Sequence, residues 1–141
     1  MDENKEIVVV CSGYFDPIHV GHIECLELAK ELGHKLIVIV NNRGQTVNKK
    51  GYEFMPVKER LKVVSSLGIV DEVFESIDED GSVCKSLAAL KPNIFAKGGD
   101  RNVGNIPENA VCEEFNIKII DGLGAKIQSS SDLVKASEEG K

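Results

Sequence analysis

An α/β fold with a parallel sheet is predicted by the alternation of short apolar runs with amphipathic stretches along the chain. Five runs rich in β-branched residues are each followed by a segment of helical character, and no repeat interrupts the pattern. Strands that alternate with helices are expected to be parallel, with right-handed crossovers. A chain of 141 residues suits one domain, so we predict a single domain over residues 1–141, with a five-stranded parallel sheet and helices on both faces.

The first strand, helix and strand follow directly from local composition. Residues 7–11 and 36–40 are β-branched runs typical of strands that are buried on both faces. Residues 20–32 place apolar side chains three or four positions apart, with glutamates on the other face, which predicts an amphipathic helix. Gly33 is a suitable stop for that helix.

The middle of the chain is predicted from its breakers. Residues 41–55 are polar and contain glycine, so we expect a loop. Proline at position 56 suits the first turn of a helix over residues 56–67. A short third strand is expected at 70–74, and a helix at 83–90 is stopped by the Lys-Pro dipeptide that follows it.

The last third repeats the pattern. We expect a fourth strand at 94–96, a loop at 97–106, a helix at 107–115, a fifth strand at 117–120 and a final helix at about 130–138. In a parallel sheet of this kind, ligands bind outside the carboxyl ends of the strands. The loops after the first, second, fourth and fifth strands are therefore the places to look for chemistry.

Charge and composition narrow the function classes. The net charge of −6 argues against a protein that binds mainly to a nucleic-acid backbone. No run of about 18 apolar residues predicts a membrane helix, and the first residues are too polar for a secretory signal. The four widely spaced cysteines are expected to be reduced, buried thiols. We therefore expect a cytoplasmic protein with no membrane or nucleic-acid partner.

The loop after the first strand is suited to an anion. It lacks a Gly-x-Gly-x-x-Gly turn, which argues against a dinucleotide site. Gly13 lets a ligand approach the backbone, and the following helix offers unpaired N–H groups and a positive dipole end. His19 and His22 are three residues apart, so they share one face of the first turn, and Gly21 leaves room between them. The alternative interpretation is a histidine pair that only caps the helix or binds a metal.

The spacing Gly13-x-Phe15-Asp16-x-x-His19-x-Gly21-His22 resembles the signature of cytidylyltransferase-like nucleotidyltransferases. The resemblance implies a Rossmann-like domain that joins a nucleotide to a phosphorylated acceptor and releases pyrophosphate. It also implies that the two histidines contact the triphosphate and stabilise the charge that develops there, and that Mg2+ arrives with the nucleotide. The nucleotide-binding residues expected in this loop are Gly13, Tyr14, Phe15, Asp16 and Gly21.

A basic segment follows the second strand. Residues 41–62 contain six basic and two acidic residues, a net charge of +4 in an acidic chain, which suits an anionic ligand. In the family that the chain resembles, a lysine before a glycine reaches the triphosphate and an arginine after a proline faces the site. Lys50 and Arg60 match these two positions, and Lys49 competes with Lys50. We expect Asn41 and Arg60 on the acceptor side; solvated lysines are the alternative interpretation.

Two further motifs follow the fourth and fifth strands. Lys97, Gly98, Gly99 and Asp100 form a Lys-Gly-Gly-Asp sequence that is similar to heptose-1-phosphate adenylyltransferases, although a tight turn is the alternative. The second motif is polar and Ser-rich, and it comprises Gln128, Ser129, Ser130 and Ser131. These serines are ready helix caps and a second cradle for phosphates. The Arg-x-x-Gly that precedes this motif in glycerol-3-phosphate cytidylyltransferases is absent.

Several choices stay open from the sequence alone. The overall signature fits CTP with a polyol or alcohol phosphate as well as it fits ATP with a sugar phosphate. The Lys-Gly-Gly-Asp match gives a slight preference for ATP. Nicotinate-mononucleotide and phosphopantetheine adenylyltransferases are weaker enzyme alternatives, and a nucleotide-binding sensor or scaffold is the alternative without catalysis. No cluster with metal-ligand spacing is seen, and the sequence allows a homodimer.

Overall fold

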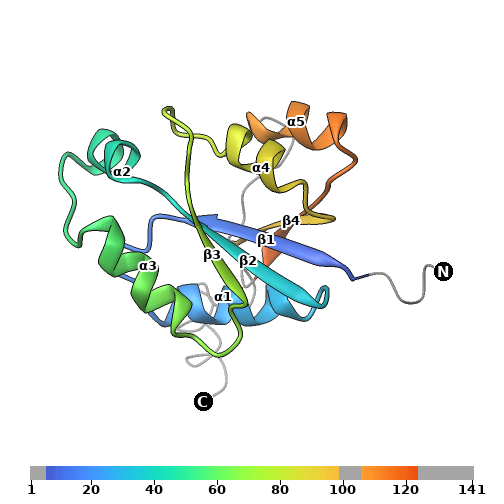
Figure 1. Cartoon of the computed structure of the whole chain (residues 1–141), viewed down its shortest axis with the longest axis horizontal. Coiled ribbons are helices and arrows are strands. Elements are labelled where there is room, and N and C mark those ends of the chain that lie inside the picture. Colours follow the sequence, from blue (N-terminus) through green and yellow to red (C-terminus); the bar gives the residue numbers. More distant parts are fainter. Residues whose placement is uncertain (1–5, 99–105, 124–141) are drawn as a thin grey trace, which may run out of the picture.

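The computed structural model describes residues 6–98 and 106–123, which form one parallel sheet with helices on both faces (Figure 1). The sheet order is β3-β2-β1-β4-β5. The strands are β1 (Val8–Gly13), β2 (Lys35–Val40), β3 (Glu72–Glu75), β4 (Ile94–Gly98) and β5 (Lys118–Leu123). The helices are α1 (Val20–Lys30), α2 (Arg43–Lys50), α3 (Val57–Ser65), α4 (Cys84–Leu90) and α5 (Glu108–Glu114). The predicted five-stranded parallel sheet is confirmed.

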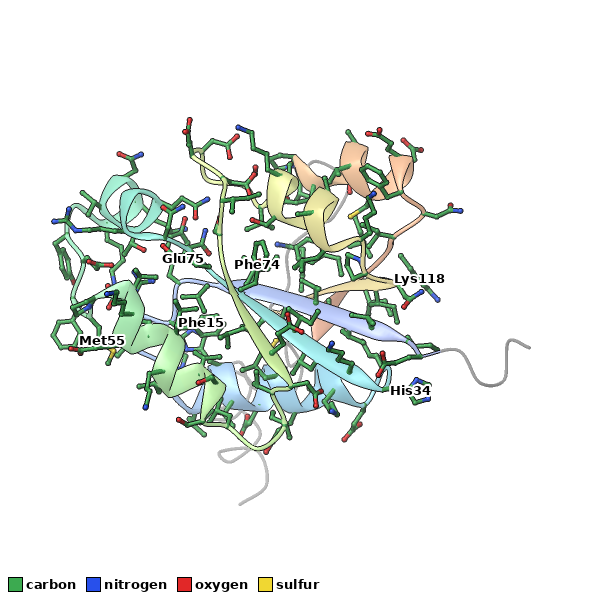
Figure 2. All side chains as sticks on the ribbon, in the orientation of Figure 1. Phe15, His34, Met55, Phe74, Glu75 and Lys118 are labelled. Atoms are coloured by element: carbon green, nitrogen blue, oxygen red, sulfur yellow. The ribbon has the colours of Figure 1, made fainter. Side chains whose placement is uncertain are left out.

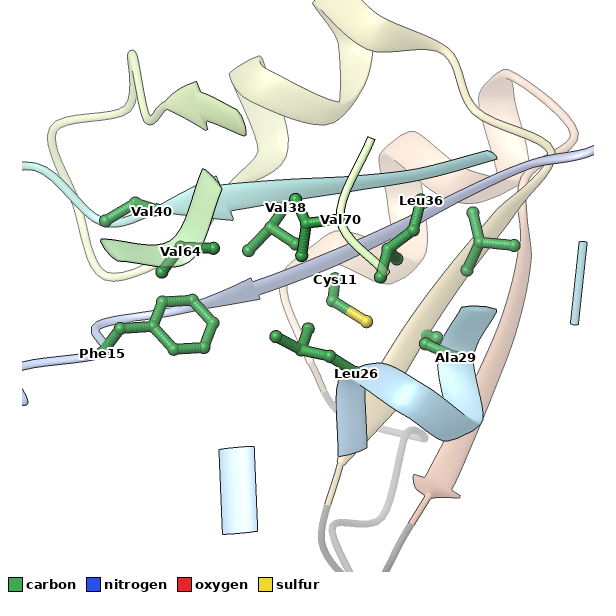
Figure 3. Close-up of a cluster of buried hydrophobic side chains, with 11 residues drawn as sticks. Cys11, Phe15, Leu26, Ala29, Leu36, Val38, Val40, Val64 and Val70 are labelled. Carbon is green, nitrogen blue, oxygen red and sulfur yellow. The ribbon is translucent and has the colours of Figure 1, made fainter. Parts of the chain in front are cut away.

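Alternate side chains of the central strands build two separate cores. Val9 and Cys11 of β1 pack against buried residues of α1 and α3, and Figure 3 shows part of this cluster. Val10, the residue between them, belongs to the other cluster, which includes buried residues of α4 and α5. Because successive side chains of a strand point to opposite faces, a run that is apolar at every position requires helices on both faces.

One element was not predicted: α2 lies within residues 41–55, which were expected to be a loop. Asn42 and Gln45 form a reciprocal capping box at its start, each side chain accepting a hydrogen bond from the other's backbone N–H. Gly51 ends it in the left-handed conformation with φ of 88°. The helix is polar, so its caps, rather than an apolar stripe, define its ends.

Strand boundaries moved by a few residues where pairing, rather than composition, decides them. β3 begins at Glu72 instead of residue 70, because it pairs with Ile37–Val40 of β2 while Val70 packs into the core. β4 and β5 extend beyond their predicted ends to Gly98 and Leu123, which pair with each other. The predicted final helix at 130–138 lies outside the described residues.

The strand order sets the place for a ligand. The chain moves outward from β1 to β2 and β3 on one side, and to β4 and β5 on the other. This reversal makes a switch point between β1 and β4, where crevices form at the carboxyl ends of the strands. Gly13 and Gly98 end these two strands. Within the described ranges, no helix is both long and apolar enough to cross a bilayer.

The close packing of the α1–β2 turn gives a stability test. A methyl group at Gly33 would lie 2.7 Å from the carbonyl oxygen of Ile7 and 2.8 Å from Cγ2 of Val9. Because backbone and core must shift to admit it, Gly33→Ala should lower the free energy of unfolding by about 1–3 kcal/mol in urea titrations. Gly68→Ala is the control, since a methyl group there meets nothing within 4 Å. Equal stabilities of the two variants would contradict this packing.

Candidate active site

The N-terminus of α1 is capped by two histidines whose rings accept hydrogen bonds from backbone N–H groups of the same turn. Nδ1 of His19 accepts a hydrogen bond from the N–H of Gly21, and Nδ1 of His22 accepts one from the N–H of His19, both at 3.1 Å. A neutral imidazole that accepts at Nδ1 carries its proton on Nε2. Each ring therefore keeps an Nε2–H donor, which bonds to no acceptor within the described part of the chain. The cap uses the Nδ1 atom of each ring and leaves the Nε2 atom for a ligand, so capping does not exclude ligand binding.

Ring contacts hold the histidines from behind. The rings of His19 and His22 stack with centroids 3.8 Å apart, and the ring of Phe15 meets His22 edge-on at 5.0 Å. Phe15 is buried in the core and adopts a positive φ of 51°. A methyl group at Gly13 would lie 2.8 Å from Cζ of Phe15. In the described structure, the missing side chain of Gly13 therefore leaves space for the Phe15 ring, which supports His22. From the sequence, this space was expected to admit a ligand.

The electrostatics of this turn favour an incoming anion. Burial and the neighbouring His19 lower the pKa of His22 to about 4, so its imidazole is neutral near pH 7. A neutral ring can donate from Nε2 without the desolvation penalty of a buried cation. The positive end of the α1 dipole lies at the same turn, and it attracts negative charge.

Lys50 is joined to the loop after β1 by Asp16. The lysine Nζ donates to the carbonyl oxygen of Asp16 and lies 3.3 Å from its carboxylate. The same carboxylate accepts the N–H groups of Phe54 and Met55 at 2.7 and 2.6 Å. Burial opposes ionisation of Asp16, but these hydrogen bonds and Lys50 outweigh it and lower its pKa. Lys50 thus occupies the last turn of α2, a fixed position rather than a mobile loop.

Arg60 lies beneath the surface at a position where a ligand contact was expected. Its side chain is 0% exposed, and it donates to the carbonyl oxygens of Tyr14, Asn41 and Met55 and to the carboxylate of Glu53. These acceptors come from the ends of β1 and β2 and from the segment before α3. Arg60 therefore holds three parts of the site together from below.

The other predicted residues are distributed along the carboxyl edge of the sheet. Tyr14 is half-buried, with Nζ of Lys49 5.4 Å from its ring centroid. Asn41 is buried and donates to Gln45, so it faces the protein. Gly21 lies in the first turn of α1, and Lys97 and Gly98 close β4. Lys97 is half-buried at the β4 edge of the switch point. The remaining predicted residues lie outside the described ranges: Gly99, Asp100, Gln128, Ser129, Ser130 and Ser131.

Two amides that sequence reasoning missed hold α2 in place. The Asn42 side chain donates to the carbonyl oxygens of Ser76 and Asp78, both at 2.9 Å. The Gln45 side chain donates to the segment at 80–82, which follows β3. The signal was present, because Asn and Gln three residues apart form a capping-box pattern. These bonds fix the helix that carries Lys50.

The donor set bears on how Mg2+ would be held. Residues 6–98 and 106–123 contain no group of three carboxylate, histidine or cysteine side chains arranged to bind a metal ion. The buried carboxylate of Asp16 is occupied by two N–H groups and an ammonium. The described residues therefore do not form a protein cage for the ion, and phosphate oxygens and water are the ligands that Mg2+ prefers at nucleotide sites.

The buried guanidinium gives a second stability test. Arg60→Met removes the buried one of the two arginines that pair with Glu53 and leaves several carbonyl oxygens without this donor, so we expect a loss of about 3–5 kcal/mol in the free energy of unfolding. Lys58→Met on the same helix removes an exposed cation and should change it by less than about 0.5 kcal/mol. Chemical denaturation of both variants measures the difference. An Arg60→Met protein as stable as the Lys58→Met control would show that the buried network is not formed.

The lowered pKa of His22 predicts a pH dependence of stability. The unfolded chain takes up a proton at this residue near pH 6.5, whereas the folded protein does so only near pH 4. Stability should therefore fall as the pH is lowered from 6.5 to 4. His22→Gln keeps an acceptor for the N–H of His19 but does not titrate, so its loss of stability in this window should be smaller. Urea unfolding at several pH values tests this. His34→Gln, at an exposed histidine, is the control and should retain the wild-type slope.

The comparisons with known proteins agree with this geometry. A cytidylyltransferase-like family model matches residues 10–131. The FAD synthase of Thermococcus sibiricus is 37% identical over 142 residues, covering 98% of this chain and 93% of that protein. The bifunctional protein HldE of Blochmanniella floridana is 42% identical over 104 residues, which cover 72% of this chain but only 21% of that protein.

A solved structure gives the same result for the fold. The lipopolysaccharide core biosynthesis protein from Thermoplasma volcanium superposes with a TM-score of 0.70 at 29% identity, covering 83% of this chain and 96% of that one. The family match includes the last four residues of β1, the paired histidines, Lys50 and the end of β4. The chain therefore belongs to the cytidylyltransferase-like family of nucleotidyltransferases.

Proposed function

We propose that the protein transfers an adenylyl group from ATP to the phosphate of a small phosphorylated acceptor and releases pyrophosphate. An oxygen of the acceptor phosphate attacks the α-phosphorus, and the bond from that phosphorus to the β-phosphate bridging oxygen breaks. The leaving pyrophosphate keeps the electron pair of that bond. No protein base is needed, because an acceptor phosphate is already ionised near pH 7. Cytoplasmic location is part of this proposal.

The observation that carries the proposal is the orientation of the histidine pair. Both Nδ1 atoms are used in the cap, so both Nε2–H groups of His19 and His22 are available as donors at the positive end of α1. Charge moves onto the β-phosphate as the α–β bond breaks. Donors that are fixed before the reaction stabilise such charge without reorganising.

Lys50 supplies the mobile charge of this site. Its ammonium is held by Asp16, in the middle of the loop that leads to His19. A triphosphate carries several negative charges and competes with a single carboxylate for that ammonium. Mg2+ bound to the phosphate oxygens neutralises part of the same charge. We propose that Lys50 moves from Asp16 to the phosphates when the nucleotide binds.

The choice of ATP rests on the β4 side of the site. Lys97 and Gly98 end β4 next to the switch point, and they begin the Lys-Gly-Gly-Asp sequence that is similar to heptose-1-phosphate adenylyltransferases. The relative from Thermococcus sibiricus is named for FAD, a compound that contains an adenylyl group. Both observations favour adenine over cytosine. Gly99, Asp100 and residues 128–131 complete the nucleotide site in this proposal.

The acceptor is proposed to lie over the carboxyl end of β2. Asn41 and Arg60 serve that side from below as positioning residues, because both side chains are buried and bonded to protein groups. A polyol phosphate is the acceptor class that the FAD synthase relatives support, since FAD joins an adenylyl group to a ribityl phosphate. A sugar phosphate is the class supported by the HldE relatives and the Lys-Gly-Gly-Asp match.

Pyrophosphate release is the experiment that tests the proposal. Each of ATP, CTP, GTP and UTP is incubated with Mg2+ and a panel of sugar and polyol phosphates. We expect release with one acceptor class and at least ~10-fold preference for ATP over CTP, since a mismatch of about 1.4 kcal/mol in the base pocket suffices. A preference for CTP would show that the transferred group is cytidylyl instead of adenylyl. Weak, equal binding of all nucleotides without release would favour a sensor or scaffold.

Loss of either histidine should affect turnover more than nucleotide affinity. His19→Ala or His22→Ala removes a donor that matters most in the transition state, so we expect kcat to fall by about 10²–10³-fold. Steady-state kinetics and ATP titration measure the two quantities. His34→Ala is the matched control, because His34 lies at the other end of the sheet from Phe15 (Figure 2). Wild-type kcat in both active-site variants would refute the assignment.

Lys50 and Lys49 make a matched pair of neighbouring cations. Lys50→Ala should weaken ATP binding by about 10-fold or more and AMP binding much less, because the ammonium is expected at the outer phosphates. Lys49→Ala should change both affinities little, since Nζ of Lys49 lies over the Tyr14 ring instead of bonding to Asp16. Calorimetric titration with ATP and AMP distinguishes the two variants. The reverse pattern would move the role to Lys49.

A further inference from the structure

Two exposed aromatic rings stand beside Lys50 in the segment between α2 and α3. Tyr52 is 57% exposed and Phe54 is 64% exposed. Glu53, which lies between them, and Met55, which follows them, are partly buried. The segment is bent at both aromatic residues and forms neither helix nor strand, and it turns the two rings toward solvent. These large aromatic side chains gain no core packing, and the ring contact seen among the described residues is that of Tyr52 with the Lys50 ammonium, so both rings are exposed to a ligand.

The backbone that carries these rings is fixed by charged groups. The N–H groups of Phe54 and Met55 donate to the buried carboxylate of Asp16 at 2.7 and 2.6 Å. The carbonyl oxygen of Met55 accepts from Arg60 at 2.8 Å, and Arg60 and Arg43 both bind the carboxylate of Glu53. Figure 2 labels Met55 at the outer end of this segment. Because the backbone is held from below at these residues, the two rings are presented at a defined place.

That place borders the phosphate site on the β2 side. Nζ of Lys50 lies 5.1 Å from the ring centroid of Tyr52, and the same atom bonds to Asp16 in the loop after β1. The rings are thus on the half of the sheet opposite Lys97 and Gly98, where the nucleotide base is proposed to bind. When Lys50 moves to a triphosphate, one face of the Tyr52 ring becomes free.

We propose that Tyr52 and Phe54 form a stacking surface for a planar ring system carried by the phosphorylated acceptor; this rests on the proposed adenylyl transfer. A flat conjugated ring stacks on such side chains with its whole face, whereas an open polyol has no planar face to stack and a sugar ring offers a smaller, puckered one. The surface therefore selects acceptors that have a planar ring at one end and a phosphate at the other. Between the two acceptor classes considered above, it favours a ring-bearing polyol phosphate.

The test uses three probes that separate the ring from the phosphate. Riboflavin 5′-phosphate has both, ribitol 5-phosphate is the same chain without the ring, and riboflavin is the ring without the phosphate. Calorimetric titration of the full chain, with the non-hydrolysable αβ-methylene analogue of ATP and Mg2+ present, measures each affinity. We expect riboflavin 5′-phosphate to bind at least ~10-fold more tightly than ribitol 5-phosphate, which corresponds to about 1.4 kcal/mol.

Variants assign this difference to the two rings. Tyr52→Leu and Phe54→Leu should each weaken the binding of riboflavin 5′-phosphate by about 10-fold and leave the binding of ribitol 5-phosphate unchanged. Tyr52→Phe keeps an aromatic ring and should keep the affinity for riboflavin 5′-phosphate. Ile77→Ala is the control, because Ile77 is a 53% exposed apolar side chain in the segment after β3. Unfolding curves that match the wild type show that the leucine variants are folded.

The outcomes separate this inference from the proposed transfer. Equal affinity for riboflavin 5′-phosphate and ribitol 5-phosphate, or leucine variants that bind the flavin as the wild type does, would overturn the stacking surface. Turnover of ringless acceptors as efficient as that of ring-bearing ones would also overturn it while supporting the transfer. Ring-dependent binding without pyrophosphate release from ATP would support the stacking surface and refute the transfer.

Discussion

The hydrogen bonds that the rings of His19 and His22 accept from backbone N–H groups at the start of α1 are the constraint on which the proposed site depends. They satisfy two backbone N–H groups at a helix end, so they are part of the fold. They also occupy both Nδ1 atoms, which determines where the protons of the two imidazoles are. A glutamate in place of His22 would cap the helix as well, but its second oxygen would be an acceptor with a negative charge instead of an N–H donor. In the proposed reaction, the residue types of this turn serve folding and chemistry together.

A second set of bonds brings distant segments to that turn. The buried carboxylate of Asp16 and the buried guanidinium of Arg60 each satisfy backbone groups of the segment between α2 and α3. Buried charges are tolerated only when they are paired and hydrogen-bonded, and both conditions are met here. The result is that Lys50 and two exposed aromatic rings are held next to the histidine loop. The buried charges of Asp16 and Arg60 therefore determine where Lys50 and the two aromatic rings lie on the surface.

The parts of this molecule that could be predicted are those encoded locally. Apolar runs such as residues 36–40 predicted the strands, and the spacing of residues 13–22 predicted the family whose model matches the chain. The α2 helix was missed because its caps, not an apolar stripe, define it. The burial of Arg60 was missed because its acceptors come from three separated segments, and no local pattern shows that they meet. The contact of the Phe15 ring with Gly13 was missed because the positive φ of Phe15 is not visible in a sequence.

The central claim is that the cap makes both imidazoles Nε2–H donors that face the triphosphate. Nitrogen-15 NMR of histidine-labelled protein at pH 7 tests it most directly, because protonated and unprotonated ring nitrogens have widely separated shifts. We predict that His19 and His22 both show an unprotonated Nδ1 and a protonated Nε2, and that addition of ATP with Mg2+ shifts the Nε2 signals while the His34 signals stay in place. An Nδ1–H tautomer at either residue, or Nε2 signals that do not respond to ATP, would contradict the account.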